Sequence, residues 1–125
     1  MTYKVLIVDD SKLARMAVAK ALSAVHPGWT RAEAGNADEA LAILAEEAPD
    51  IAVLDFNMPG RDGLELADEL RRARPDMPVA VISANHQQEV VDRAREVGAA
   101  FLTKPLTEAA LKAFLTEALQ RLAPR

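Results

Sequence analysis

Residues 51–60 read IAVLDFNMPG, an apolar run that ends in a single aspartate, Asp55, and passes at once into turn residues. The same form recurs at residues 5–10, which read VLIVDD, and at residues 79–83, which read VAVIS. Continuous apolar runs of this length are typical of strands buried on both faces, as in a parallel sheet. Each run therefore predicts a buried strand with a polar residue at its carboxyl end.

Apolar runs and helix-period segments alternate along the whole chain. We expect strands at residues 5–8, 30–34, 51–54, 79–82 and 100–102, with five amphipathic helices between and after them. This alternation predicts an α/β fold in which helices cover both faces of a doubly wound, five-stranded parallel sheet.

Some helix faces and ends can be predicted as well. Asn36 and Glu39 have the spacing of a capping box, and Pro75 and Gly98 are expected to end the third and fourth helices. Two apolar stripes are predicted to face the core: Ala14, Ala17, Val18, Ala21, Leu22 and Val25 in the first helix, and Leu111, Phe114, Leu115, Ala118, Leu119 and Leu122 in the last.

Composition limits the possible functions. The chain has 125 residues, half of them apolar, which predicts one domain spanning residues 1–125. Because cysteine is absent, we exclude disulfides and thiol catalysis, and any metal must bind oxygen or histidine ligands. The start of the chain has no secretion signal, so we expect a cytoplasmic protein with no membrane contact. The net charge is −4 and the one basic cluster, residues 71–74, suits a helix end, so we expect no direct nucleic-acid binding.

Polar residues gather where the predicted strands end. Asp9 and Asp10 follow the first strand, Asp55 the third, Ser83 the fourth and Lys104 the fifth. The carboxyl ends of parallel strands meet at one edge of a sheet, so these side chains should share a cleft. Three neighbouring carboxylates need protons or a divalent cation, and Mg²⁺ fits an all-oxygen site that also takes a phosphoryl group. Asp55 would be the nucleophile, with Ser83 and Lys104 contacting the phosphoryl oxygens.

Each of these residues also has an ordinary explanation. Asp10 or Ser11 could be the N-cap of the first helix, Asp55 a turn residue, Ser83 a cap of the fourth helix, and Lys104 a solvated charge. Their joint occurrence at strand ends favours a shared site.

The whole chain resembles the receiver domains of two-component response regulators. The resemblance is carried by residues 5–10 (VLIVDD), residues 55–60 (DFNMPG) with Gly63, residues 83–84 (SA) and residues 104–105 (KP). It implies a flavodoxin-like fold with strand order 2-1-3-4-5, and a regulator of the chemotaxis type that consists of this domain alone.

The resemblance also implies a role for each site residue. Asp55 would accept a phosphoryl group from a sensor histidine kinase or a phosphotransfer protein. The remaining roles concern the metal, the phosphoryl oxygens and the turn: Asp9, Asp10, Asp55 and the backbone carbonyl of Asn57 would hold Mg²⁺, Ser83 and Lys104 would bind phosphoryl oxygens, and the Lys104–Pro105 peptide bond would be cis. Such a protein catalyses only its own phosphoryl uptake and autodephosphorylation, so it is not an enzyme in the usual sense.

The signal would leave through a switch that involves Ser83 and Phe101. By resemblance, phosphorylation draws Ser83 toward the site, Phe101 turns inward, and the surface formed by residues 87–97, 100–102 and 107–119 changes for a downstream protein partner. We give no role to His86, because a histidine in a surface loop is usually solvated.

Two other functions have to be weighed. A haloacid-dehalogenase-like phosphatase also uses a strand-end aspartate and Mg²⁺, but it needs a second aspartate where this chain has Asn57. A receiver-like interaction module that is never phosphorylated usually lacks part of the acidic pair, the acceptor or the lysine.

The single tryptophan, Trp29, opens the second predicted strand away from the site, so we expect Mg²⁺ to change its fluorescence very little.

Overall fold

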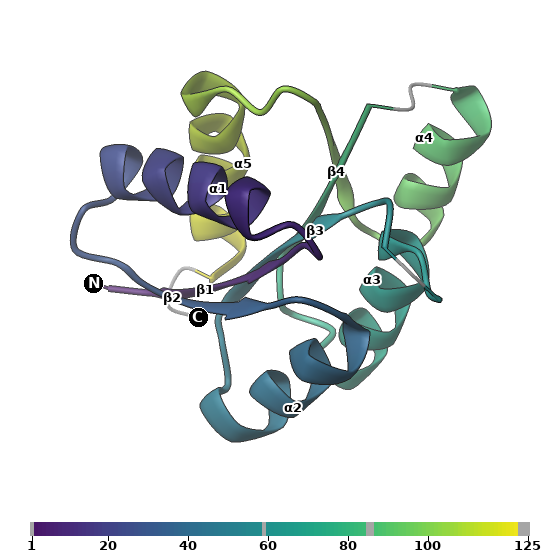
Figure 1. Cartoon of the computed structure of the whole chain (residues 1–125), viewed down its shortest axis with the longest axis horizontal. Coiled ribbons are helices and arrows are strands. Elements are labelled where there is room, and N and C mark those ends of the chain that lie inside the picture. The colour runs from purple at the N-terminus through teal and green to yellow at the C-terminus, as the bar shows by residue number, and fades with distance from the viewer. Residues whose placement is uncertain (1, 59, 85–86, 123–125) are drawn as a thin grey trace.

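The computed structural model describes residues 2–58, 60–84 and 87–122. Five strands form one parallel sheet in the order β2-β1-β3-β4-β5 (Figure 1). The strands are β1 (Lys4–Val8), β2 (Thr30–Ala34), β3 (Ile51–Asp55), β4 (Val79–Ser83) and β5 (Ala100–Thr103). The predicted doubly wound sheet and the strand order implied by the resemblance are confirmed.

Five helices flank the sheet, as expected. They are α1 (Lys12–Val25), α2 (Ala37–Glu47), α3 (Gly63–Ala73), α4 (Gln88–Glu96) and α5 (Glu108–Leu122). Helices α1 and α5 cover one face, and α2, α3 and α4 cover the other (Figure 1). Among the described residues, no helix combines the length and the apolar character that a membrane crossing requires.

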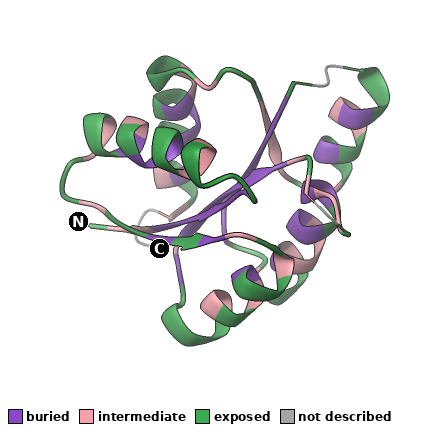
Figure 2. Cartoon of the chain, in the orientation of Figure 1, coloured by how far each residue is buried: buried purple, intermediate pink, exposed green. Residues whose placement is uncertain are grey.

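The core consists of two layers, one on each face of the sheet. Strands β3 and β4 are buried at every position, which is why their sequences are continuous apolar runs (Figure 2). The edge strand β2 alternates between exposed and buried residues over its last positions. The central strands are thereby fixed on both sides, and their carboxyl ends form a rigid platform.

Helix α1 begins at Ser11, whose Oγ accepts a hydrogen bond from the backbone N–H of Ala14 at 3.2 Å. Its buried face comprises Val18, Ala19 and Leu22. The prediction that Ala17 belongs to this face is wrong, because Ala17 is exposed. Alanine is small enough that exposing it costs little, so its presence does not define a buried face.

The predicted capping box of α2 is only half formed. Asn36 Oδ1 accepts a hydrogen bond from the N–H of Glu39 at 2.8 Å, but the Glu39 carboxylate accepts from the N–H of Gly35 at 2.7 Å instead of from Asn36. Gly35 permits this, since a Cβ there would lie 3.3 Å from the carboxylate. A complete capping box occurs instead at the start of α3, between Asp62 and Glu65.

The predicted ends of α3 and α4 agree with the structure. Helix α3 ends at Ala73, two residues before Pro75, and α4 ends at Glu96, with Gly98 at a positive φ of 76° just beyond it. Both termini lie on the side of the sheet away from the polar strand ends.

Candidate functional site at the carboxyl edge of the sheet

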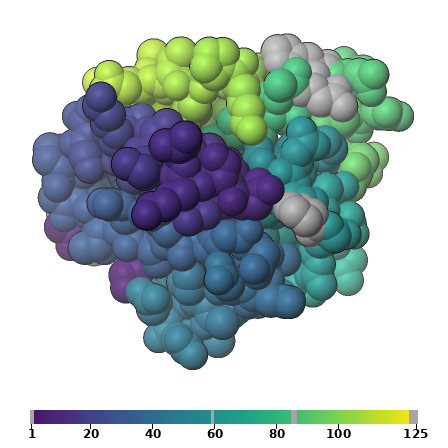
Figure 3. All heavy atoms as spheres, viewed as in Figure 1, coloured from purple at the N-terminus to yellow at the C-terminus, as the bar shows by residue number. Residues whose placement is uncertain are grey.

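The structure brings the three predicted carboxylates together. Carboxylate oxygens of Asp9, Asp10 and Asp55 all lie within 4.8 Å of one another. Strand register explains this, because Val8 is paired with Leu54, so the residues that follow each of them emerge side by side. In the space-filling view, the purple atoms that lead into α1 border both the teal segment after β3 and the yellow-green segment before α5 (Figure 3).

Asp55 ends β3 with only 5 % of its surface exposed. The next residue, Phe56, donates its backbone N–H to Ile82 O at 2.9 Å, and Gly63 donates its N–H to Phe56 O at 2.8 Å. A Cβ at position 63 would lie 2.2 Å from Asp55 O, a distance no side chain tolerates. Gly63 is therefore required for the backbone to close tightly behind Asp55.

Lys104 reaches the site from the end of β5. Its Nζ lies 2.7 Å from Asp55 Oδ1, and its backbone N–H donates to Ser83 O at 3.1 Å. The Lys104–Pro105 peptide bond is cis, which is the geometry the resemblance implies. The Nζ contact has the distance of an ion pair, yet no described residue makes a hydrogen bond of good angle to Asp55 Oδ1.

Asp9 is buried and held at both its backbone and its side chain. Its N–H donates to Ala34 O at 3.1 Å, and its Oδ1 accepts from the N–H of Ser11 at 2.9 Å. Burial is the main cause that raises the pKa of Asp9 above its ordinary 3.8. Repulsion from Asp55 acts in the same direction, whereas the Ser11 N–H and Lys104 oppose it.

Asp10 is exposed at the outer side of this cluster. Because Ser11 is the N-cap of α1, capping does not explain the Asp10 carboxylate. Asp55 Oδ1 lies at ion-pair distance from Lys104 Nζ but accepts no hydrogen bond from the described residues. The ammonium group of Lys104 is also the only one that faces the three carboxylates in the part of the chain that the structure describes. These features fit a hard divalent cation such as Mg²⁺, which takes carboxylate oxygens and keeps several waters.

Ser83 and Phe101 lie on one face of the sheet. Phe101 is opposite Val81 in the register, and Ser83 is two residues beyond Val81 on the same strand, so all three side chains point toward one side. That is the side that α4 covers, and half-buried Phe101 packs into its core layer. Ser83 is 1 % exposed, and the N-cap of α4 is Gln87, so Ser83 does not cap that helix.

The other predicted residues are less informative. Asn57 is exposed in the loop two residues after Asp55. His86, to which we give no role, lies outside the described residues.

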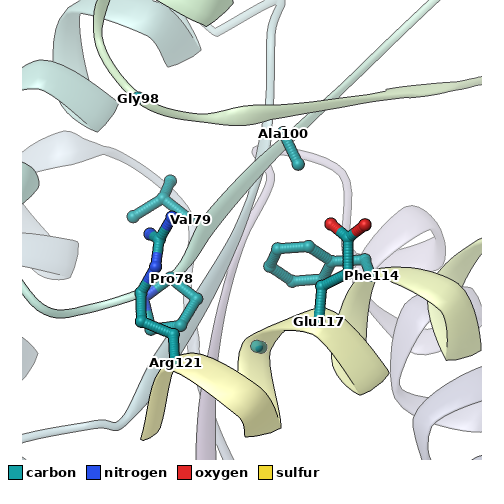
Figure 4. A pocket seen from close by; sticks show the side chains of 8 residues that line it. Pro78, Val79, Gly98, Ala100, Phe114, Glu117 and Arg121 are labelled. Carbon is teal, nitrogen blue, oxygen red and sulfur yellow. The ribbon is translucent and has the colours of Figure 1, made fainter.

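A cleft of about 470 Å³ adjoins the carboxylates and has mainly apolar walls. Its lining comprises Asp9, Ala14, Ala17, Val18, Ile82, Lys104, Pro105 and Leu106. A second hollow, of about 70 Å³, lies between α5 and the beginnings of β4 and β5 (Figure 4). It contains none of the predicted site residues, and its Glu117 and Arg121 carry opposite charges.

Arg15 lies beside the site and was not predicted from the sequence. Its Nη1 donates to Asp9 O at 2.6 Å, and its Nε lies 3.2 Å from Glu33 Oε1 on β2. The available signal was a cation one turn into the helix that follows the acidic pair, but its acceptor is a backbone carbonyl, which no side-chain motif reveals.

Comparison with known proteins agrees with this geometry. Residues 5–116 match the family described as the response regulator receiver domain. The chain belongs to this family. The receiver domain is 38 % identical over 106 residues to the transcriptional regulatory protein PdtaR of Mycobacterium tuberculosis, a match that covers 83 % of this chain and 50 % of PdtaR.

Two further similarities extend over more of the receiver domain. It is 35 % identical over 123 residues to the phosphate regulon transcriptional regulatory protein PhoB of Pseudomonas aeruginosa, covering 96 % of this chain and 53 % of PhoB. The chain thus spans about half the length of the curated relatives it matches. The structure of the Vibrio cholerae chemotaxis protein CheY4 superimposes with a TM-score of 0.85 at 29 % identity, covering 95 % of this chain and all of CheY4.

Proposed function

We propose that this receiver domain takes up a phosphoryl group on Asp55 in an Mg²⁺-dependent reaction and signals through the surface formed by α4, β5 and α5. The observation that carries the proposal is the imbalance of charge at the site. A buried Asp55 lies with two other carboxylates beside a single ammonium group. The carboxylates of such a site can bind a metal cation, and the Lys104 ammonium group can bind an incoming phosphoryl group.

The chemistry follows from these positions. A carboxylate oxygen of Asp55 attacks the phosphorus of a phosphohistidine, the P–N bond breaks, and its electron pair returns to the imidazole. Bound Mg²⁺, held by Asp9, Asp10, Asp55 and the Asn57 carbonyl, would supply charge stabilisation. Lys104, now 2.7 Å from Asp55 Oδ1, would pair with a phosphoryl oxygen, and Ser83 would donate a hydrogen bond to another.

The switch rests on the face that Ser83 and Phe101 share. Phosphorylation adds negative charge and strong hydrogen-bond acceptors at the strand ends, which favours movement of Ser83 toward Asp55. Because Ser83 points toward the layer that contains Phe101 and α4, such a movement would change packing beneath the output surface. The partner at that surface would be a downstream protein.

We further propose that residues 1–125 form one receiver domain, which acts in the cytoplasm and receives its phosphoryl group from a histidine kinase or phosphotransfer protein. Two relatives are named transcriptional regulatory proteins, and this chain matches about half of each. Our proposal that the chain itself does not contact nucleic acid is supported by its basic cluster: Arg71 donates to Met77 O at 3.1 Å, and Arg72 pairs with Asp68.

Phosphoryl uptake can be tested directly by intact mass. Incubation with acetyl phosphate and Mg²⁺ should add one phosphoryl group to the wild-type protein and to Asp38→Asn, in which an exposed acid on α2 is changed. The addition should be absent in Asp55→Asn and without Mg²⁺. If the wild type gains no mass under any condition, the chain is a phosphorylation-independent interaction module. Repeated turnover of a phosphomonoester that is lost in Asp55→Asn would instead identify a phosphatase.

A further inference from the structure

The Arg15 side chain bridges the end of β1 and the edge strand β2. Its Nη1 donates to Asp9 O at 2.6 Å and its Nε lies 3.2 Å from Glu33 Oε1. The side chain is only 18 % exposed, and its Nη1 lies 3.5 Å from the position a Cβ would have on Gly35. Arg15 is thus packed into the junction of β1, β2 and α1, with its Nη1 and its Nε each in contact with an oxygen.

Three contacts fix Asp9, and one of them depends on this side chain. The N–H of Asp9 is bonded to Ala34 O, and its carboxylate accepts from the N–H of Ser11. Both partners are backbone groups, which most residues at those positions would provide. The carbonyl of Asp9 is held by Arg15, and this carbonyl belongs to the peptide unit that joins Asp9 to Asp10. Fixing that peptide restrains ψ of Asp9 and φ of Asp10, and so restrains the backbone from which both carboxylates project.

We propose that Arg15 is a positioning residue for the metal site, which fixes the Asp9–Asp10 peptide while Glu33 holds the guanidinium in place. This inference rests on the proposed Mg²⁺ site. A fixed peptide keeps both carboxylates aimed at the cation, so less freedom is lost when the cation binds. Arg15 acts through Asp9 and needs no contact with the metal.

Electrostatics alone predicts the opposite effect of Arg15. A positive charge near a cation site weakens cation binding, so removing it would strengthen Mg²⁺ affinity. If positioning dominates, removing Arg15 weakens the affinity. The two explanations therefore differ in the sign of the change.

Arg31 provides a matched control. It lies on β2, and its Nε is 3.3 Å from Glu33 Oε2, the second oxygen of the carboxylate that holds Arg15. Among the described residues, Glu33 is its only ion-pair partner, so Arg31 has the charge of Arg15 without the contact to Asp9. A change at Arg31 removes the same charge, and one partner of Glu33, while both residues of the Arg15–Asp9 contact stay unchanged.

The test is the Mg²⁺ dissociation constant of the full chain, measured by calorimetry for the wild type, Arg15→Gln and Arg31→Gln. We expect Arg15→Gln to bind Mg²⁺ roughly 10-fold more weakly, and Arg31→Gln to match the wild type or bind slightly more tightly. Equal or tighter binding by Arg15→Gln would overturn the inference. Absence of Mg²⁺ binding by the wild type would instead refute the proposed function.

Thermal unfolding without Mg²⁺ separates positioning from a purely structural role. A structural role would lower the melting temperature of Arg15→Gln but leave the Mg²⁺ affinity of the folded protein unchanged, which would also overturn the inference. If Arg15→Gln does not fold, Arg15→Lys takes its place. Lysine keeps the charge but lacks the planar fork, so positioning predicts weaker Mg²⁺ binding and charge alone predicts no change.

Discussion

We expect Asp9 to lower the stability of the metal-free protein at neutral pH, because burial beside Asp10 and Asp55 disfavours its charged form and raises its pKa. Asp9→Asn removes that charge and keeps an oxygen for the Ser11 N–H. We expect the variant to have a free energy of unfolding roughly 1 kcal/mol higher than the wild type at pH 7 without Mg²⁺. Urea denaturation measures the difference, and a less stable variant would contradict it.

The difference in free energy of unfolding between Asp9→Asn and the wild type should change with pH in a defined direction. The pKa of Asp9 is raised above 3.8 in the folded protein, so the folded protein binds this proton more tightly than the unfolded chain. The stabilisation from the bound proton is fully present below pH 3.8 and is lost as the pH rises through the folded pKa. The advantage of Asp9→Asn should therefore be small in acid and grow toward neutral pH. Mg²⁺ should reduce it at pH 7, because the cation stabilises the wild type more than the variant.

At the scale of the elements, Asp62 has two separate roles at the start of α3. Its Oδ1 accepts from the N–H of Glu65 at 2.8 Å, and its Oδ2 lies 3.2 Å from Arg93 Nη2 on α4. We expect Asp62→Ala to lower the free energy of unfolding by roughly 1 to 2 kcal/mol, because the helix loses its cap. Urea denaturation measures this loss.

Asp62→Asn serves as the control for that change. Asparagine keeps an oxygen for the Glu65 N–H but has no charge for Arg93, and a partly exposed ion pair contributes less than about 1 kcal/mol. If both variants lose the same stability, the cap is not the larger of the two contributions.

The elements also differ in how well the sequence predicted them. Strands buried on both faces could be located because burial leaves an unbroken apolar run, and β3 and β4 are buried throughout. Details of helices were less predictable. The Glu39 carboxylate accepts a hydrogen bond from the N–H of Gly35 and not from the N–H of Asn36, as a capping box would require. These two donors are one residue apart, so only the backbone geometry decides between them. Arg15 was missed for a similar reason, since its partner is a carbonyl.

At the scale of the whole molecule, the site and the single tryptophan lie at opposite ends of the sheet. Trp29 precedes β2, where its ring stacks on the His26 ring with 3.9 Å between the ring centroids. It also makes an edge-to-face contact with the Tyr3 ring, with the centroids 5.1 Å apart. The carboxylates lie beyond the other ends of the strands. We expect saturating Mg²⁺ to leave the tryptophan fluorescence nearly unchanged, and a large quench would show that the cation binds elsewhere or alters the distant end.

The site could be predicted from the sequence because the parallel sheet collects strand ends. Asp9, Asp10 and Asp55 were expected to meet and do so, and Lys104 contacts Asp55. The order of the strands, however, was predicted only through the family resemblance, because hydrophobic periodicity does not show which strands are neighbours. The roles of these residues in phosphoryl transfer remain predictions.

The order of the strands has a consequence for the chain while it is being made. Pairing of β1 with β3 requires residues only as far as position 55, whereas Lys104 follows β5, near the end of the sequence. Synthesis proceeds from the N-terminus and a domain folds as a unit, so the three carboxylates are made well before the sheet that brings them together can be completed. When the sheet forms, β5 brings Lys104 to the cluster in the same step, and its ammonium group offsets part of the repulsion among the carboxylates.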